Sequence, residues 1–325
     1  MANNKKLNSI AIAGNILVDK INSISAYPKM GKLVEINKIS NAVGGCVPNV
    51  AIDIKRLFPS FNVTAVGKIG NDGEGAFVKE TLMREGIDCS GIKLGERTGF
   101  TDVMSVEGGE RTFFTYSGGN ASFGYDDIDF DNLNVEMFHL GYFLLLDKID
   151  IGDGIKILKE LKNRGIKTSI DLVSKDGGNY SVVLPALQYT DNLIINEIEA
   201  QGIANVKTDD LLFVAKKIKE LGVSERVIIH QPTYACCLSN EGYTIVPSLD
   251  LPKGFVKGTT GAGDAFCAGA LIGIANNLTD KEILELASIS AVCNLSEANS
   301  IDGMRTFEEA KKLCSNFKRK DLGFC

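Results

Sequence analysis

The sequence contains one glycine-rich stretch with a single acidic residue, Lys257-Gly258-Thr259-Thr260-Gly261-Ala262-Gly263-Asp264-Ala265-Phe266. Gly261 and Gly263 flank one alanine, so the backbone can adopt conformations that a Cβ forbids and can approach a ligand closely. The small apolar residues from Ala265 to Ala275 predict a buried helix directly afterwards. A glycine turn that leads into a helix leaves backbone N–H groups unpaired at the positive end of the helix dipole, which favours an anion. A carboxylate is out of place in a pocket that only holds phosphate, so Asp264 indicates chemistry as well as binding.

A second group of polar residues follows an apolar segment near the middle of the chain. Asn196-Glu197-Ile198-Glu199 comes directly after Leu193-Ile194-Ile195, which has the composition of a buried strand. Ligands of open α/β sheets bind at the carboxyl ends of the strands, so Asn196 and Glu199 are candidate site residues. The same residues also fit a helix start, in which Asn196 caps the helix and Glu199 closes a capping box. The two roles are compatible.

Residues that suit a hydroxyl-rich ligand lie nearer the N-terminus. Gly44 and Gly45 permit close backbone approach, and Asn49 supplies an amide that both donates and accepts hydrogen bonds. Asp19 adds a carboxylate just past the end of the first predicted strand. Because each hydroxyl of a polyol both donates and accepts, a pocket of Asp, Asn and bare backbone suits such a ligand.

Apolar runs and their spacing predict the elements that position these residues. Strands are expected at 7–13, 63–66, 137–141, 167–173, 192–196 and 226–230, and helices at 50–58, 154–164, 209–221, 281–296 and 307–317. Pro48 suits the first position of a helix, and the glycines from Gly67 to Gly75 predict a loop before a helix that ends near Gly86. Alternation of strands and helices after Asp126 predicts a mostly parallel, doubly wound α/β sheet with ligands at the carboxyl ends of its strands.

A different pattern predicts a small second sheet. Residues 103–106 and 111–116 read as two short strands joined by a turn at Gly108-Gly109, which is a β-hairpin signal. Residues 33–39 partly alternate apolar and polar side chains, as in a half-exposed strand. Together these segments predict a small antiparallel sheet separate from the main body.

Composition limits the class of protein. The chain has 325 residues, 44% of them hydrophobic, and a net charge of −6, which fits an ordinary globular protein and argues against nucleic acid as the main partner. Residues 1–8 lack the apolar core of a signal peptide, and no later apolar run reaches membrane-spanning length, so a cytoplasmic protein without membrane partners is expected. Eight scattered cysteines without a C-x-x-C pair are better explained as buried thiols than as disulfides or zinc ligands.

Other chemistries are poorly supported. The glycines from Gly67 to Gly75 lack the G-x-G-x-x-G spacing of a dinucleotide site, and no G-x-x-x-x-G-K-[ST] phosphate loop occurs. His139 and His230 lie in or beside apolar strands, which favours core or rim histidines over a Ser-His-Asp hydrolase. Cys236-Cys237 would point to opposite faces of a strand and so could not both bind one metal.

Four motifs, in order along nearly the whole chain, make the sequence resemble the ribokinase-like (PfkB) carbohydrate kinases. They are Gly44-Gly45-Cys46-Val47-Pro48-Asn49-Val50-Ala51, Gly70-Asn71-Asp72-Gly73-Glu74-Gly75, Asn196 to Glu199, and Thr260-Gly261-Ala262-Gly263-Asp264-Ala265-Phe266. The resemblance implies one ribokinase-like domain over 1–325. Its α/β core would carry a β-sheet lid formed by about 15–42 and 97–120, and this lid often makes homodimers in the family.

The resemblance also implies residue roles. Asp264 would be the catalytic base and Gly261, Ala262 and Gly263 the anion hole, while Glu199 would hold Mg²⁺ with the help of Asn196. Residues expected at the sugar are Asp19, Gly44, Gly45 and Asn49, and those expected at ATP are Asn196, Thr260, Gly261, Gly263 and Asn294. Arg111 in the lid hairpin would either reach substrate or phosphate or be a solvated charge.

Three departures from the family pattern refine this expectation. Gly258 stands where the signature usually has Asp, a K⁺ ligand in some members, so monovalent cations should activate weakly or not at all. Cys46 follows Gly44-Gly45 where kinases of sugar phosphates tend to have Lys, which favours a free sugar. The segment Asp171 to Lys175 lacks the Asp-Pro-Asn-x-Arg form of many fructokinases and ketodeoxygluconate kinases.

The resulting expectation is ATP-dependent phosphorylation of a hydroxymethyl group on a free sugar or sugar-like acid. A nucleoside kinase of the same fold is the first alternative, because Phe113, Phe114 and Tyr116 in the lid could stack on a base. A non-catalytic regulator that binds a sugar or nucleotide is the second.

Overall fold

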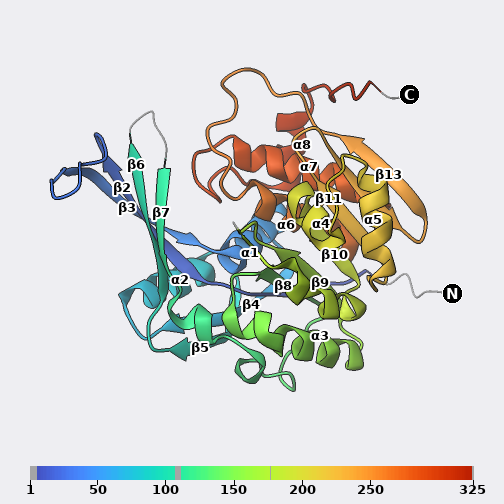
Figure 1. Cartoon of the computed structure of the whole chain (residues 1–325), viewed down its shortest axis with the longest axis horizontal. Helices are drawn as coiled ribbons and strands as arrows, with labels where there is room; N and C mark the ends of the chain where they lie inside the picture. Colours follow the sequence, from blue (N-terminus) through green and yellow to red (C-terminus); the bar gives the residue numbers. More distant parts are fainter. Residues whose placement is uncertain (1–5, 107–110, 176, 324–325) are drawn as a thin grey trace.

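The computed structural model describes residues 6–106, 111–175 and 177–323, and its main body is a nine-stranded sheet in the order β13-β12-β11-β10-β9-β8-β1-β4-β5 (Figure 1). The parallel strands are β1 (Ser9–Ala13), β4 (Asn62–Gly70), β5 (Asp88–Gly95), β8 (Met137–Phe143), β9 (Lys167–Leu172), β10 (Asn192–Asn196) and β11 (Arg226–His230). Strands β12 (Tyr234–Ser239) and β13 (Gly242–Pro247) extend one edge in antiparallel orientation. The predicted mostly parallel, doubly wound α/β sheet is confirmed.

Helices cover both faces of this sheet. They are α1 (Cys46–Leu57), α2 (Gly73–Arg84), α3 (Gly154–Asn163), α4 (Glu197–Ala204), α5 (Leu211–Glu220), α6 (Ala262–Ala275), α7 (Asp280–Leu295) and α8 (Phe307–Cys314). Short helical segments of other types lie at Gly118–Ser122, Tyr125–Asp127, Ile149–Asp153 and Tyr180–Tyr189. Among the described residues, no helix is both long enough and apolar enough to cross a bilayer.

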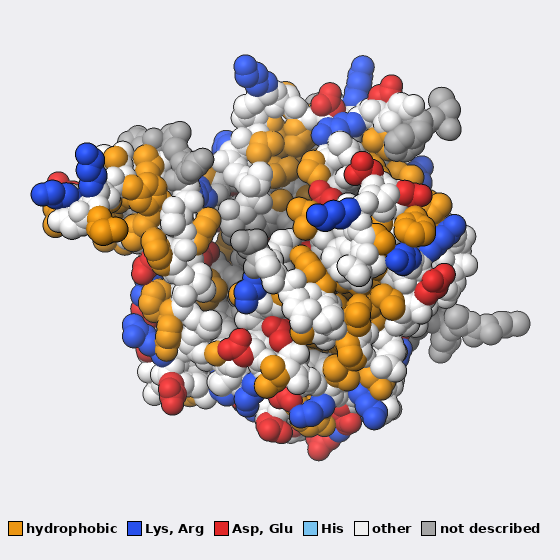
Figure 2. Space-filling view, viewed as in Figure 1, with side chains coloured by type: hydrophobic (Ala, Val, Ile, Leu, Met, Phe, Trp, Pro, Cys, Tyr) orange, Lys and Arg blue, Asp and Glu red, His pale blue; other side chains and the backbone are white. Residues whose placement is uncertain are grey.

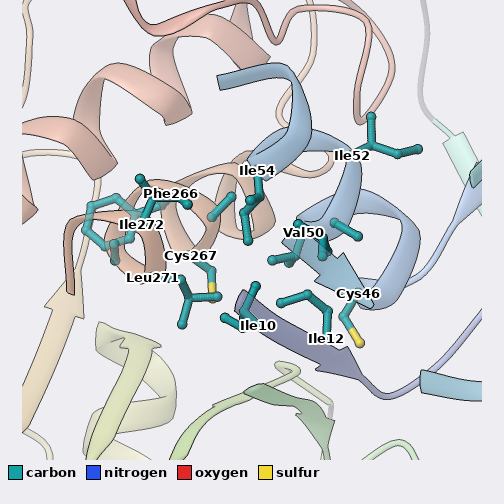
Figure 3. Packing of buried hydrophobic residues seen from close by; sticks show 14 of the residues in the cluster. Ile10, Ile12, Cys46, Val50, Ile52, Ile54, Phe266, Cys267, Leu271 and Ile272 are labelled. Atoms are coloured by element: carbon teal, nitrogen blue, oxygen red, sulfur yellow. The ribbon is translucent and has the colours of Figure 1, made fainter. Parts of the chain in front are cut away.

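The central strand β1 explains why the sheet is buried on both sides. Ile10 and Ile12 pack into a hydrophobic cluster with α1 and α6, and Figure 3 shows them beneath Val50, Leu271 and Ile272. The alternate residues Ala11 and Ala13 belong to a second cluster, which includes residues of α3, α4 and α5. A strand covered on both faces must be apolar at nearly every position, as the sequence of β1 is.

The second sheet has four strands in the order β3-β2-β6-β7 and projects from the main body at the upper left of Figure 1. Its strands are β2 (Leu17–Ile24), β3 (Ile36–Gly44), β6 (Gly99–Val106) and β7 (Arg111–Tyr116). The predicted hairpin of β6 and β7 is confirmed, although its turn at Gly108-Gly109 lies outside the described residues. The prediction of a purely antiparallel sheet is wrong, because β2 pairs with β6 in parallel.

Several predicted boundaries are also wrong. Gly67 and Gly70 lie inside β4 rather than in a loop, since a Cβ at Gly67 would stand 2.7 Å from Cδ1 of Ile16 and the strand needs this close approach. Helix α1 begins at Cys46, so Pro48 is its third residue. Strand β3 begins at Ile36, later than predicted, and continues to Gly44.

Candidate active site

The carboxyl ends of β8, β9 and β10 meet the N-terminus of α6 around a cavity of about 220 Å³. Its polar lining comes from five segments that are distant in sequence: Tyr142, Asp171 and Ser174, Asn196 and Glu199, His230, and Gly261, Gly263 and Asp264. This is the edge at which parallel α/β sheets bind ligands. The structure therefore brings together the predicted residues Asn196, Glu199, Gly261, Gly263 and Asp264.

Asp264 lies in the first turn of α6 and is only 5% exposed. The Nδ2 atom of Asn49, from α1, donates to Oδ2 of Asp264 at 2.8 Å. The hydroxyl of Tyr142 donates from the end of β8 and lies 3.1 Å from each carboxylate oxygen. Burial raises the pKa of Asp264 to about 6, Asp171 adds to this, and the two hydrogen bonds oppose it. Asp264 is therefore mostly ionised at neutral pH and able to accept a proton.

The turn before Asp264 has the geometry of an anion site. Gly261, the N-cap of α6, has a φ of 81°, and within the described parts of the chain no side chain caps this helix. A Cβ on Gly261 would lie 2.7 Å from Cβ of Ser300, so both its conformation and its close packing require glycine. At Gly263, by contrast, a Cβ would have only His230 Cε1 within 4 Å, at 3.9 Å, which leaves room for a ligand. An uncapped helix start with open space in front of it favours a negatively charged group.

Glu199 combines the two roles expected from the sequence. A reciprocal capping box forms at the start of α4, in which Glu199 N donates to Asn196 Oδ1 at 2.9 Å and Asn196 N donates to Glu199 Oε2 at 3.0 Å. Ser174 Oγ donates to the other carboxylate oxygen at 2.9 Å. The side chain is buried, and burial raises its pKa to about 7. No lysine or arginine of the described chain pairs with it, so this buried carboxylate suits a divalent cation in the cavity.

A larger groove of about 650 Å³ adjoins the cavity along α6 and α7. Asn196, His230 and Gln231 form part of its polar wall, and its apolar wall includes Leu249, Val256, Phe266, Val292 and Leu295. The ring of His230 lies 4.6 Å from that of Phe266, and burial lowers the pKa of His230 to about 4, so the imidazole is neutral. A groove with apolar walls and a few polar groups suits the base and ribose of a nucleotide.

Asn294 does not join this groove. Its side chain is buried in α7, and its Nδ2 donates to the carbonyl of Ser300 at 2.6 Å. It thus supports the loop that packs on Gly261 rather than lining the groove.

A third pocket lies between the small sheet and the loop 297–302. Asp19, Lys38, Arg111 and Phe113 line it from the sheet, and Thr260 lines it from the glycine-rich segment. Burial raises the pKa of Asp19 to about 6. Arg111 is exposed, and its Nη1 donates to the carbonyl of Ala298 at 3.5 Å, which spans the gap between the small sheet and the main body.

Gly44 does not line this pocket but packs against one of its residues, because a Cβ there would stand 2.6 Å from Oδ2 of Asp19.

Buried asparagines fix the base of the small sheet to the main body. Asn15 Oδ1 accepts from Cys46 N at 2.9 Å, at the start of α1. Asn120 bonds to both polar backbone atoms of Ile16, with Ile16 N donating to its Oδ1 and its Nδ2 donating to the carbonyl, each at 2.8 Å. Gly45 has a φ of 92°, and a Cβ there would lie 2.6 Å from the carbonyl of Asn15. We call Asn15, Ile16, Gly45, Cys46 and Asn120 the root of the small sheet.

The Gly70 to Gly75 motif has a similar structural role. Asp72 caps α2 by accepting from Gly75 N at 2.8 Å, and it also accepts from Thr98 N at 2.8 Å. Thr98 immediately precedes β6, so this motif ties α2 to the other side of the small sheet.

Gly258 packs against backbone. A Cβ there would lie 2.7 Å from the carbonyl oxygen of Ala298, so the space beside it is too small for a side chain.

Beneath Asp264, three buried side chains, His139, Asp171 and Cys267, have polar or sulfur atoms within 4.8 Å of one another. Their atoms are engaged in local contacts: His139 Nδ1 lies 3.1 Å from Ser169 Oγ, and Asp171 Oδ1 accepts from Tyr142 N at 2.6 Å. The expectation that His139 is a satisfied core histidine agrees with these contacts.

Sequence reasoning missed Tyr142, Asn15 and Asn120. The signal for Tyr142 was its place directly after the predicted end of a strand at Gly141, the edge where ligand-binding residues gather. No pattern singled out Asn15 or Asn120, because their hydrogen bonds join segments 31 and 104 residues apart.

Known proteins share this sequence pattern and architecture. The profile described as "pfkB family carbohydrate kinase" matches residues 9–306. The probable fructokinase-6, chloroplastic, of Arabidopsis thaliana is 28% identical over 299 residues, which cover 86% of this chain and 74% of that protein. Ribokinase of the same plant is 24% identical over 315 residues, covering 94% and 80%. The structure of Arabidopsis thaliana ribokinase complexed with ribose and ATP gives a TM-score of 0.80 at 21% identity and covers 94% of this chain and 98% of that one, which confirms the ribokinase-like fold.

Proposed function

The chain belongs to the pfkB family of carbohydrate kinases, and from this premise we propose that it transfers the γ-phosphoryl group of ATP to a hydroxymethyl group of a free sugar or sugar-like acid. The observation that carries the proposal is the position of Asp264. A buried carboxylate that is ionised at neutral pH stands in the first turn of an uncapped helix, directly after a glycine turn with room for a phosphate. A proton acceptor and an anion site are thereby adjacent.

In this mechanism Asp264 is the general base. The sugar hydroxyl binds beside its carboxylate and gives up its proton as the bond to phosphorus forms. The backbone N–H groups of Gly261 and Gly263 face the transferred phosphoryl group and stabilise its equatorial oxygens without having to reorganise. The N–H group of Ala262, which was expected to join them, donates instead to the carbonyl of Thr259 at 3.2 Å. Asn49 holds Asp264 in this arrangement, in addition to the sugar-binding role expected for it.

The groove along α6 and α7 takes the nucleotide, and the cavity beside it takes the triphosphate end. Asn196 lines both spaces and is placed to contact the phosphates. Glu199, a buried carboxylate without a cationic partner among the described residues, would hold Mg²⁺ partly through water, and the ion would neutralise charge on the phosphates. Thr260 faces the third pocket, so it contacts the sugar side of the reaction rather than the base.

The pocket under the small sheet takes the sugar. Asp19 accepts hydrogen bonds from its hydroxyls. Gly44 and Gly45, expected at the sugar, do not line this pocket and instead pack against Asp19 and Asn15. Two cationic side chains, Lys38 and Arg111, line the same pocket, so a sugar that carries an acid group would also fit it. The small sheet acts as a lid that excludes water, the competing phosphoryl acceptor.

A nucleoside kinase is the second candidate. Phe113 lines the same pocket as Asp19 and is 54% exposed, so its ring is available to stack on a base.

We also propose that the chain forms a homodimer through the small sheet. Its exposed apolar side chains include Ile36, Ile39, Phe114 and Tyr116, and Figure 2 shows orange side chains concentrated on this projection. Analytical ultracentrifugation tests this, and a monomer at micromolar concentration contradicts it.

The seven described cysteines are all free, and six of them are buried. Free thiols support a reducing, cytoplasmic location, which cell fractionation can check.

A coupled ADP-release screen with Mg²⁺ and ATP tests the kinase proposal directly. The panel contains free aldoses and ketoses, sugar acids, sugar phosphates and nucleosides, with Asp264→Asn as the matched control. Turnover with a free sugar or sugar acid supports the proposal, and a preference for nucleosides selects the second candidate. ATP and sugar binding without any turnover would instead identify a non-catalytic regulator.

A further inference from the structure

We propose that Tyr142 is a positioning residue for the phosphoryl-transfer reaction, whose phenol hydroxyl holds the carboxylate of Asp264 in orientation and keeps it ready to receive the sugar's proton. This inference rests on the proposed role of Asp264 as general base. None of the four family motifs in the sequence contains Tyr142, which lies near the end of β8.

The Tyr142 hydroxyl is 3.1 Å from both oxygens of Asp264, so it bridges the carboxylate instead of bonding to one side. Asn49 Nδ2 holds Oδ2 at 2.8 Å from a different element. Donors from β8 and α1 thus fix the carboxylate at two points, which restricts its rotation. A phenol is a suitable donor, because burial raises the pKa of Tyr142 and keeps it protonated.

The backbone of Tyr142 has a φ of 62°. A bulky residue rarely adopts this left-handed conformation, which persists only where its surroundings enforce it and which occurs often at functional sites. Here Tyr142 N donates to Oδ1 of Asp171 at 2.6 Å. The preceding Gly141 packs so closely on α1 that a Cβ would stand 2.8 Å from Sγ of Cys46. The chain therefore turns sharply at Tyr142, near the end of β8, and the turn directs the phenol to Asp264.

Asp264 is surrounded by titratable groups from several elements. The titratable groups that face it are Cys46 and Asp53 of α1, His139 of β8, Asp171 of β9 and Cys267 of α6. No lysine or arginine of the described chain forms an ion pair with it, and Asp171 disfavours its charge. Asn49 and Tyr142 are the hydrogen-bond donors that favour the ionised form, so loss of either should raise the proton affinity of Asp264.

The test is Tyr142→Phe, which keeps the ring and removes only the hydroxyl. We measure kcat/KM for the sugar found in the screen from pH 5 to pH 9. The acid limb of the wild type should lie at about 6, the pKa of Asp264. In the variant it should move up by roughly one pH unit, because one of the carboxylate's hydrogen bonds is gone. The activity deficit should be about fivefold at pH 6 and should shrink toward pH 9, whereas a purely structural defect would lower kcat/KM equally at every pH.

The matched control is Tyr125→Phe, which removes a tyrosine hydroxyl far from the site; its ring packs on Phe130. This variant should keep the acid limb of the wild type.

A second readout does not depend on activity. Aspartate labelled with ¹³C at the carboxyl group is followed by NMR through a pH titration, and Asp264→Asn assigns the resonance of Asp264. The Asp264 resonance should titrate about one pH unit higher in Tyr142→Phe than in the wild type. An unchanged titration, or an acid limb that stays in place, overturns the proposal. If the resonance moves while the wild-type rate does not follow the ionisation of Asp264, the base assignment itself fails, and the positioning role fails with it.

Discussion

Asp264→Asn should remove catalysis and leave the fold intact, because the structure can accommodate the new amide without losing hydrogen bonds. The substitution preserves side-chain size, and the Tyr142 hydroxyl can still donate to the carbonyl oxygen of the new amide. Among the described residues, the buried Oδ1 atom of Asn49 has no hydrogen-bond partner, although its Nδ2 bonds to Asp264. A half-turn of the Asn49 amide would direct this oxygen to the new NH₂ group, so that one hydrogen bond between the two side chains replaces the other.

The same substitution should stabilise the protein at alkaline pH. Burial raises the pKa of Asp264 to about 6 from its ordinary value of 3.8, a difference of about two pH units. A raised folded-state pKa means that the protonated form is favoured in the folded protein, so stability is greatest below pH 4 and falls as pH rises through 6. Above pH 6 the ionised group costs up to ~3 kcal/mol, and the amide carries no such cost.

Urea unfolding and a coupled ADP-release assay measure the two effects. The variant should unfold at higher urea than the wild type at pH 8, and this advantage should fade toward pH 4. Its kcat should fall by about 10²-fold to 10⁴-fold, the usual contribution of a general base, while its affinity for ATP stays near that of the wild type. A variant that keeps more than about a tenth of wild-type kcat would refute the base assignment. A variant less stable than wild type at pH 8 would refute the account of its buried charge.

Three further predictions concern the surrounding groups. Glu199→Gln should raise the Mg²⁺ concentration for half-maximal activity about 10-fold to 100-fold, measured by metal titration; an unchanged requirement contradicts the metal assignment. Gly261→Ala should lower the free energy of unfolding by about 1–2 kcal/mol or more in urea, because alanine disfavours a φ of 81° and its Cβ meets Ser300; full stability would contradict this packing. Initial rates in K⁺ and in Tris buffers should be similar, because Gly258 lacks the carboxylate that binds K⁺ in related kinases; a large K⁺ stimulation would overturn this expectation.

The main sheet could be predicted because its strands are buried on both faces. The apolar runs at 192–196 and 226–230 match β10 and β11 residue for residue. The antiparallel strands β12 and β13 were not predicted. Cys236 packs on one side of the sheet and Cys237 on the other, as expected for a strand, but such two-sided burial in β12 gives no alternation of polar and apolar residues.

The catalytic half of the site could be predicted from motifs, since the motifs hold Asn196, Glu199 and Asp264 at the ends of predicted elements. Their mutual contacts could not. Asn49 and Asp264 are 215 residues apart, and only the packing of α1 against α6 brings the amide of Asn49 to the carboxylate of Asp264. Tyr142 could not be found from propensity at all, because its role depends on a backbone conformation that its residue type disfavours.

The root of the small sheet decides how a lid made of this sheet could close. Asp19 pairs with Thr101, close to the root, whereas Arg111 pairs with Ser105 farther out along the same strand. Four residues of strand separate these positions by roughly 13 Å, so pivoting the sheet by 10° would carry Arg111 about 2 Å farther than Asp19. The sheet would then rotate about an axis at its root, close to the proposed sugar pocket. Both ends would move together, but Arg111 would be displaced much more than Asp19, so closure would change the contacts of Arg111 while leaving those of Asp19 nearly unchanged.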